Sequence, residues 1–285
     1  MKSNFNKIIL GTANFGLQYG NKNKKLNDKN IKEILNLAKR YGIKTIDTAQ
    51  SYGDAEKKLG NYKNNFRFIT KISNFKKISK KKIIDIINYS RNNLKVKKID
   101  YLMFHDCREF KKENFKLPKL ILKEKNILYK KIGVSIYKPS ELYECIKYKH
   151  LDCIQIPFNL LDTRWLNINF KKIKKKNKSL ELHVRSIFLR GMLPKKIQRL
   201  PNWFKDKKKL KIILNSIKKK HKVSLENILF SYVYQQNWID KIILGVSSTY
   251  QLKKTKDFLK YRKSIRIKKN IFNFVPKKIL MPKYW

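Results

Sequence analysis

The sequence predicts a single-domain (β/α)8 barrel, or TIM barrel, because short apolar segments alternate with segments of helical spacing along almost its whole length. Each apolar segment is followed by a polar or glycine-containing turn. We expect eight strands, at 7–10, 44–48, 67–72, 100–104, 131–135, 153–157, 180–185 and 241–245. The chain has 285 residues, close to the ~250 of a typical barrel. One domain covering 1–285 follows, with a basic and aromatic tail from about residue 262.

Helical spacing fills most of the gaps between these strands. We expect helices at 30–42, 81–94, 118–126, 140–148, 210–220, 225–236 and 249–261. Asp28 and Ser140 stand where a short polar side chain caps a helix, and Gly42 is placed to end the first helix. The connection 159–179 is the least regular. Two helical stretches separate the last two strands, so the barrel carries an extra segment there.

The formal net charge of +50 would attract polyanions such as nucleic acid. The lysines, however, are spread over the whole chain, with clusters at 173–178, 205–209 and 218–222 that lack repeating aromatic partners. Solvated outer helix faces account for them, and an AT-rich coding sequence accounts for the excess of Lys, Asn and Ile. The sequence therefore predicts no specific nucleic-acid partner.

Cysteine use and hydropathy indicate a cytoplasmic protein. No stretch is apolar over the ~18 residues that a membrane span needs, and the first residues do not resemble a signal peptide, so no membrane insertion is expected. Cys107, Cys145 and Cys153 are odd in number and lack C-x-x-C spacing. They predict neither a disulfide framework nor a metal site. The sequence does not predict an oligomeric state.

Four chemically suited side chains fall at or just after the ends of successive predicted strands: Asp47, Tyr52, Lys71 and His105. In a parallel barrel these strand ends share one mouth, so the four would converge. A tyrosine of pKa near ~10 acts as a general acid at neutral pH only beside a cation. Lys71 would supply that cation, Asp47 would hold Lys71, and His105 would bond a substrate oxygen. Each residue alone has an ordinary structural explanation, but together they suit protonation of a carbonyl oxygen as hydride arrives.

The motifs around these residues resemble the aldo-keto reductase family from Leu10 to about Thr255. LGTANFG at 10–16 resembles the family's opening strand and glycine turn, and IDTAQSYGDAEKKLG at 46–60 resembles its signature. The family's Asp and Tyr fall on Asp47 and Tyr52, its Lys on Lys71 in ITK, and its His on His105 in YLMFHD. The resemblance implies a barrel that catalyses a reversible carbonyl–alcohol reaction.

The resemblance also implies an extended NADPH, with NADH as the alternative, bound without a Rossmann glycine fingerprint. Ser135 and Gln155 would lie against the nicotinamide carboxamide, with Gly11 and Thr12 in the same pocket. Phosphate and adenine contacts map to the segment 245–255. The full set implied for the cofactor is Gly11, Thr12, Asp47, Ser135, Gln155, Arg185, Ser186, Gly245, Ser247 and Gln251.

The sequence departs from the family at three places, one of which is Ile136 in place of a frequent Asn after Ser135. Arg185 and Ser186 stand where many members have an aromatic residue that stacks on the nicotinamide, so Arg185 would either lie on that ring or meet an anionic group. Lys254 and Thr255 replace the usual Glu-Asn pair near the adenine. The Arg-Ser form resembles a bacterial branch associated with surface polysaccharides and nucleotide-linked sugars.

Three hypotheses follow for function. The leading one is an NAD(P)H-dependent oxidoreductase that reduces an aldehyde or ketone, with small carbonyl compounds, sugars and nucleotide sugars as candidate substrates. An anionic substrate would suit the basic mouth. The second is a cofactor-binding regulatory barrel with little turnover, and the third is a polyanion-binding protein that has reused the fold.

Overall fold

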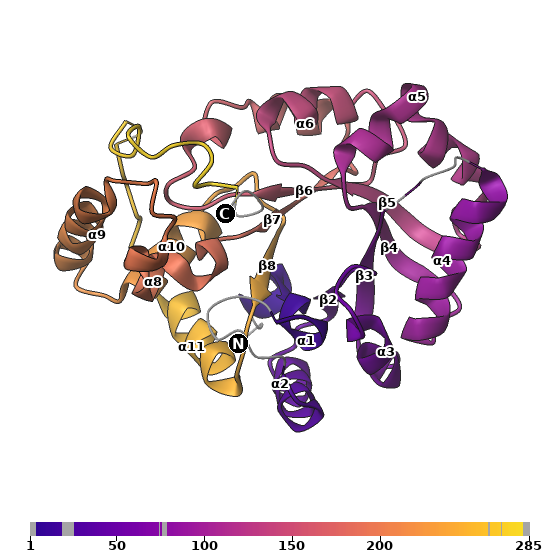
Figure 1. The fold of residues 1–285 in the computed structure, drawn as a ribbon, viewed down its shortest axis with the longest axis horizontal. Coiled ribbons are helices and arrows are strands. Elements are labelled where there is room, and N and C mark those ends of the chain that lie inside the picture. Colours follow the sequence, from indigo (N-terminus) through magenta and orange to yellow (C-terminus); the bar gives the residue numbers. More distant parts are fainter. Residues whose placement is uncertain are drawn as a thin grey trace.

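The computed structural model describes residues 4–18, 26–73, 75, 79–261, 263–268 and 270–281, and its centre is a closed barrel of eight parallel strands (Figure 1). Each strand pairs with the next, and β8 closes the barrel on β1. The strands are β1 Ile8–Gly11, β2 Thr45–Asp47, β3 Arg67–Ile72, β4 Ile99–Phe104, β5 Tyr129–Ser135, β6 Cys153–Pro157, β7 Glu181–Arg185 and β8 Lys241–Gly245. The predicted (β/α)8 barrel is confirmed, and no predicted strand end is wrong by more than two residues.

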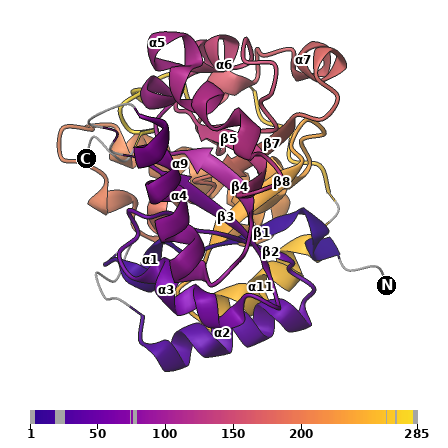
Figure 2. The same ribbon diagram turned by 90° about the vertical axis from the view of Figure 1, so that its right-hand side faces the viewer.

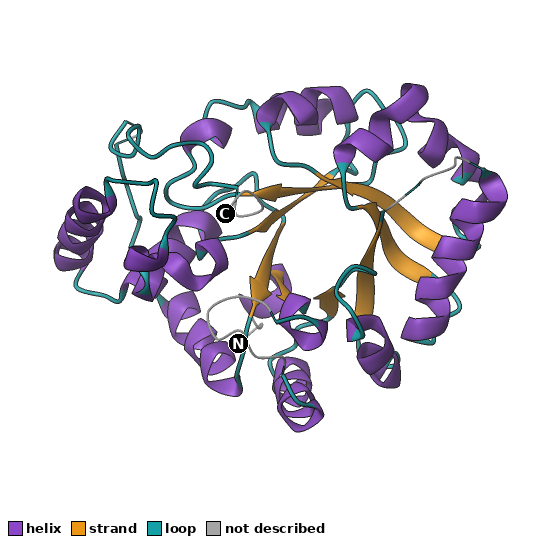
Figure 3. Ribbon diagram, viewed as in Figure 1, coloured by secondary structure: helices purple, strands orange, loops and turns teal. Residues whose placement is uncertain are grey.

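Helices surround the strands on the outside (Figure 3). They are α1 Ala13–Gly16, α2 Asp28–Arg40, α3 Ala55–Leu59, α4 Lys80–Leu94, α5 Cys107–Leu120, α6 Pro139–Cys145, α7 Phe170–Lys176, α8 Met192–Lys195, α9 Lys207–His221, α10 Leu225–Tyr234 and α11 Thr249–Lys260. In Figure 2, α2, α3 and α11 lie side by side under one edge of the barrel. Six of the seven predicted helices match within three residues at each end.

The predicted helix 118–126 is wrong, and so are two predicted caps. Helix α5 ends at Leu120 and has a kink at 112–115, where three residues have positive φ. The cap of α2 is Asn27, whose side chain accepts from the amide of Asn30 at 2.8 Å, because a cap precedes the first helical residue and Asp28 is already helical. Ser140 likewise lies inside α6. Gly42 does end α2, with φ of 75°.

The barrel interior holds a small apolar cluster of Ile9, Ile69, Met103, Cys153 and Ile243. Side chains alternate along a strand, so inward-facing residues of β4 are two apart. Met103 therefore lies between Tyr101, nearer the amino end, and His105, just past the carboxyl end. This apolar cluster separates polar groups at the two ends of the barrel. The larger core lies between the strands and the outer helices.

The extra segment predicted between the last two strands comprises α8, α9 and α10 with short 3-10 turns. The chain after α11 packs back on this segment. The Gln235 side chain donates to the Ile265 carbonyl at 2.7 Å and accepts from its amide at 2.9 Å. Lys209 lies over the Phe274 ring. The tail beginning near 262 is therefore docked, as far as the structure describes it, against α9 and α10.

Across the described ranges, every helix is too short or too polar to span a bilayer. In the same part of the chain, no group of three or more His, Cys, Asp and Glu side chains gathers in a way that would hold a metal ion. Cys107, Cys145 and Cys153 are all buried free thiols.

Candidate functional site

A cavity of about 550 Å³ is lined by residues from the carboxyl ends of several strands and the loops that follow them. Tyr52, His105 and Asp47 line it, and Lys71 lies behind Asp47. Nine of the ten residues expected at the cofactor line it: Gly11, Thr12, Asp47, Gln155, Arg185, Ser186, Gly245, Ser247 and Gln251. Ser135 does not line the cavity. It is buried, and its hydroxyl accepts a hydrogen bond from Arg185 at 3.3 Å.

A buried ion pair joins β2 to β3 at the cavity floor. Lys71 Nζ lies 2.6 Å from Asp47 Oδ1, and the two residues are 1% and 3% exposed. The second carboxylate oxygen of Asp47 accepts from Gln155 Nε2 at 2.9 Å, and Lys71 also donates to the Thr48 carbonyl at 3.0 Å. Burial lowers the pKa of Lys71, while Asp47 opposes that shift. Asp47 thus stabilises a cation that would otherwise be costly to bury.

Tyr52 is carried by a tight turn that packs against the β1 loop. A Cβ on Gly16 would lie 1.8 Å from the Tyr52 carbonyl oxygen, and one on Gly53 would lie 2.6 Å from the Gly16 carbonyl. Gly53 also has φ of +61°, which favours glycine. This packing positions the Tyr52 ring with Lys71 Nζ 5.4 Å from its centroid.

His105 directly follows β4, and its amide donates to the Ile72 carbonyl of β3 at 2.9 Å. Its ring meets the Tyr52 ring edge-on, with centroids 6.0 Å apart and planes at 80°. Ser51 Oγ lies 3.2 Å from Nδ1. Burial, then the positive charges of Lys71 and Arg185, lower the pKa of His105 to about 4. His105 is therefore neutral at pH 7 and contributes a hydrogen bond, not a charge.

The β1 loop ties the site together through residues that the sequence did not single out, above all Asn14. The Thr12 amide and hydroxyl both donate to the Asp47 carbonyl, at 3.0 and 2.9 Å. Asn14 Nδ2 donates to the Val246 carbonyl at 2.6 Å and lies 3.2 Å from Ser247 Oγ. The signal for Asn14 was its place in LGTANFG, directly after a strand. Its partners lie at the other end of the chain.

Arg185 ends β7 and lines the same cavity as Tyr52 and His105. One face of its guanidinium covers the Tyr137 ring, 4.3 Å from the centroid. Its Nη2 donates to Ser135 Oγ and to the Ile136 carbonyl, both at 3.3 Å, and Nη1 donates to Ser186 Oγ at 3.4 Å. Tyr137 was another residue missed at the sequence level. The next turn is tight, with φ of 65° at Ser186 and 54° at Arg190.

The loop after β8 forms the other part of the cavity. A Cβ on Gly245 would have no atom within 4 Å, so the backbone there faces open space. The Ser247 amide donates to Gln251 Oε1 at 2.7 Å, and Ser248 caps α11 by accepting from the Gln251 amide. Charged and aromatic residues missed by sequence reasoning also line the cavity: Arg190, Glu226 and Tyr250.

Comparisons with known proteins agree with this geometry. The model of the aldo/keto reductase family matches residues 7–267. Comparison with curated proteins gave no match. Among solved structures, an aldo-keto reductase from Bacillus halodurans in its holo form is 17% identical, with a TM-score of 0.72 over 96% of this chain and 91% of that one. A glycerol dehydrogenase from Gluconobacter oxydans is 20% identical, with a TM-score of 0.66 over 90% and 88% of the two chains.

Both structural neighbours share the fold, and the family match covers nearly the whole chain. The cavity at the carboxyl ends of the strands agrees with these comparisons. The chain belongs to the aldo/keto reductase family and is an NAD(P)H-dependent oxidoreductase of carbonyl compounds.

Proposed function

We propose that the protein reversibly reduces an aldehyde or ketone to an alcohol at this cavity, with NADPH as the hydride donor and NADH as the alternative. One observation carries the proposal: the buried Lys71–Asp47 pair lies beside Tyr52 and His105 at the wall of a cavity large enough for a substrate and part of a cofactor.

The four side chains divide the work of moving one proton. Lys71 stabilises negative charge on the Tyr52 oxygen, which makes Tyr52 a better acid toward the carbonyl oxygen. Asp47 favours the charged form of Lys71 and opposes the lowering of its pKa by burial. Neutral His105 orients the carbonyl by hydrogen bonding. The nicotinamide, when bound, supplies the hydride.

The cavity residues support a dinucleotide. Gly11 and Gln155 line the part near Asp47, and the Gly245 backbone faces open space in the part near α11. Arg190 and Lys254 also line the cavity and would suit the 2′-phosphate of NADPH, whereas the carboxylate of Glu226 would suit a ribose hydroxyl. The Ser247 backbone amide donates to the Gln251 side chain within the protein. To bind a phosphate, the Ser247 amide would have to give up this hydrogen bond.

The test is a titration of the purified protein with NADPH, and separately with NADH, at moderate salt. Intrinsic fluorescence reports the binding. A carbonyl panel that includes sugars and nucleotide sugars comes next. Saturable binding with oxidation of the nucleotide supports the proposal and gives the cofactor preference. Nucleotide binding without reduction of any panel member favours a regulatory barrel, and failure to bind either nucleotide contradicts the proposal.

A further inference from the structure

We propose that Arg185, braced by Tyr137, binds an anionic group carried by the carbonyl substrate, a carboxylate or a phosphate. This inference rests on the proposed function and adds a substrate class to it. In this proposal, Arg185 contacts the substrate and does not stack on the nicotinamide ring.

The first support is that Arg185 is held in place by neutral groups only. It contacts the Ser135 and Ser186 hydroxyls, the Ile136 carbonyl and the Tyr137 ring. Within the described ranges, no carboxylate forms an ion pair with it. Arg164, also largely buried, instead shares two hydrogen bonds with the carboxylate of Asp162 at 2.7 and 2.6 Å. An arginine fixed without a counter-charge is prepared for an anion from outside.

The second support is the charge balance around the reacting centre. Asp47 compensates Lys71 through their ion pair, and His105 is neutral. The charge of Arg185 is then left over at the cavity wall. It is close enough to lower the pKa of both His105 and Lys71. An anion bound to Arg185 would neutralise this remaining positive charge next to the carbonyl site.

The third support is the orientation set by Tyr137. The ring covers one face of the guanidinium, so that group cannot tilt freely, and both residues line the cavity with Tyr52 and His105. The anion and the carbonyl would therefore belong to the same small molecule. Small oxo acids, sugar phosphates and nucleotide sugars share this chemistry, and the test must separate carboxylate from phosphate.

Two matched pairs of aldehydes separate charge from shape: 4-carboxybenzaldehyde against methyl 4-formylbenzoate, and D-glyceraldehyde 3-phosphate against D-glyceraldehyde. Dissociation constants are measured by calorimetry on protein loaded with NADP⁺, which cannot reduce an aldehyde, and kcat/KM with NADPH follows. We expect wild type to prefer at least one anionic partner. Arg185→Met should weaken that partner about 10- to 150-fold, the loss of a charged hydrogen bond, and leave the neutral partner and the nucleotide dissociation constant unchanged.

Two further variants sharpen the assignment. Arg185→Lys keeps the charge but loses the planar stacked fork, so an intermediate loss is expected. Arg199→Gln removes one exposed positive charge away from the cavity lining and should leave the preference intact. The preferred pair identifies carboxylate or phosphate.

Equal binding of charged and neutral partners by wild type would overturn the inference while leaving the proposed function standing. So would a preference that survives in Arg185→Met, or a variant that weakens nucleotide binding instead, since Arg185 would then serve the cofactor. If the protein binds neither nucleotide, the proposed function fails, and the same pairs titrated onto the free protein still decide whether Arg185 selects an anion.

Discussion

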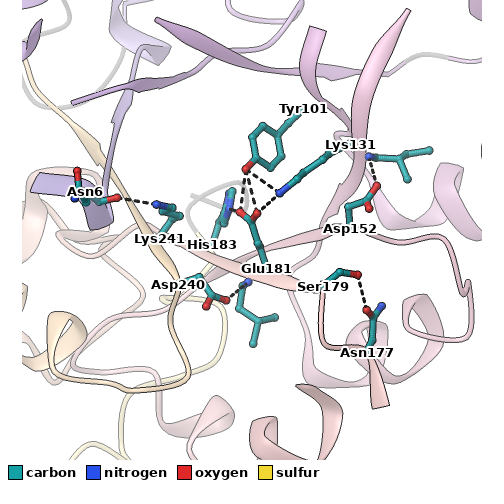
Figure 4. A network of polar contacts seen from close by, with 12 residues as sticks. Asn6, Tyr101, Lys131, Asp152, Asn177, Ser179, Glu181, His183, Asp240 and Lys241 are labelled. Carbon is teal, nitrogen blue, oxygen red and sulfur yellow. Dashed lines mark hydrogen bonds and ion pairs between the residues drawn. The ribbon is translucent and has the colours of Figure 1, made fainter. Parts of the chain in front are cut away.

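The two ends of the barrel hold the same four kinds of side chain in different arrangements. At the carboxyl end are Asp47, Lys71, Tyr52 and His105. At the amino end, Glu181, Lys131, Tyr101 and His183 form the polar network drawn in Figure 4. Both clusters contain a buried or half-buried ion pair, and in both the lysine lies near the tyrosine ring, 5.4 Å away at one end and 5.0 Å at the other.

The two clusters differ in the groups that donate hydrogen bonds to the carboxylate. The oxygens of Asp47 accept from Lys71 and Gln155. Glu181 instead accepts directly from the Tyr101 hydroxyl at 3.0 Å, as well as from Lys131 and His183.

This contact holds the phenol proton in place. Burial and the charge of Glu181 raise the pKa of Tyr101 to about 12. Although burial of Glu181 opposes the charged form, the hydrogen bonds from His183 and Lys131 lower its pKa to about 2. The amino-end cluster is thus a stable ion network with a poor acid, and the cavity lined by Tyr52 and His105 lies at the other end. Four matching kinds of side chain do not suit proton transfer unless the carboxylate contacts the lysine and the tyrosine faces a cavity.

The largest expected effect separates the two tyrosines. Tyr52→Phe should lower kcat by about 10²- to 10⁴-fold, the usual contribution of a general acid, with the nucleotide dissociation constant unchanged in a fluorescence titration. Tyr101→Phe should leave kcat unchanged and lower the free energy of unfolding by about 1.5–3 kcal/mol, because it loses a hydrogen bond to a charged group. A Tyr52→Phe variant at the wild-type rate would remove the assignment of Tyr52.

The two lysines should differ in what their loss does to stability. Lys71→Met leaves the buried Asp47 carboxylate without its cation, which costs about 3–5 kcal/mol of unfolding free energy. The Lys131 side chain is 39% exposed, and Glu181 keeps Tyr101 and His183 as partners, so Lys131→Met should cost about 1 kcal/mol or less. Urea unfolding of both variants measures the difference. Equal losses would contradict the distinction between the two ion pairs.

The last difference between the two clusters is a separation of pH windows. His105 has a folded pKa of about 4, below its ordinary 6.5, so the unfolded state binds the proton first and stability falls as the pH drops from 6.5 to 4. Glu181 has a folded pKa of about 2, below its ordinary 4.5, so its contribution is present above pH 4.5 and lost toward pH 2. Urea midpoints measured across pH should flatten in the upper window for His105→Gln and in the lower one for Glu181→Gln. Flattening in the opposite windows would refute these environments.

Strand positions and the convergence of Asp47, Tyr52, Lys71 and His105 were predictable, because apolar runs mark barrel strands and parallel strand ends meet at one mouth. The contacts around Arg185 were not. Its stacking on Tyr137 depends on where β5 and β7 end, two strands that β6 separates in the barrel.

Other features were hidden for physical reasons. Asn14 meets Val246 across 232 positions of sequence, a distance that only the closed barrel makes short. Positive φ at Ser186 and Arg190 runs against their intrinsic preference and is imposed by tertiary packing. The helix 118–126 was misplaced because apolar spacing does not reveal the kink in α5.

The packing of Gly16 on the Tyr52 carbonyl restricts how this enzyme can change. Even one methyl group at Gly16 or Gly53 would collide with backbone, which cannot yield as a side chain does. The turn that carries Tyr52 is therefore restricted in the substitutions that it can accept. New substrates, whether reached by natural divergence or in a laboratory library, should therefore arise through changes in the loops after β4 and β7, with Tyr52 left in place.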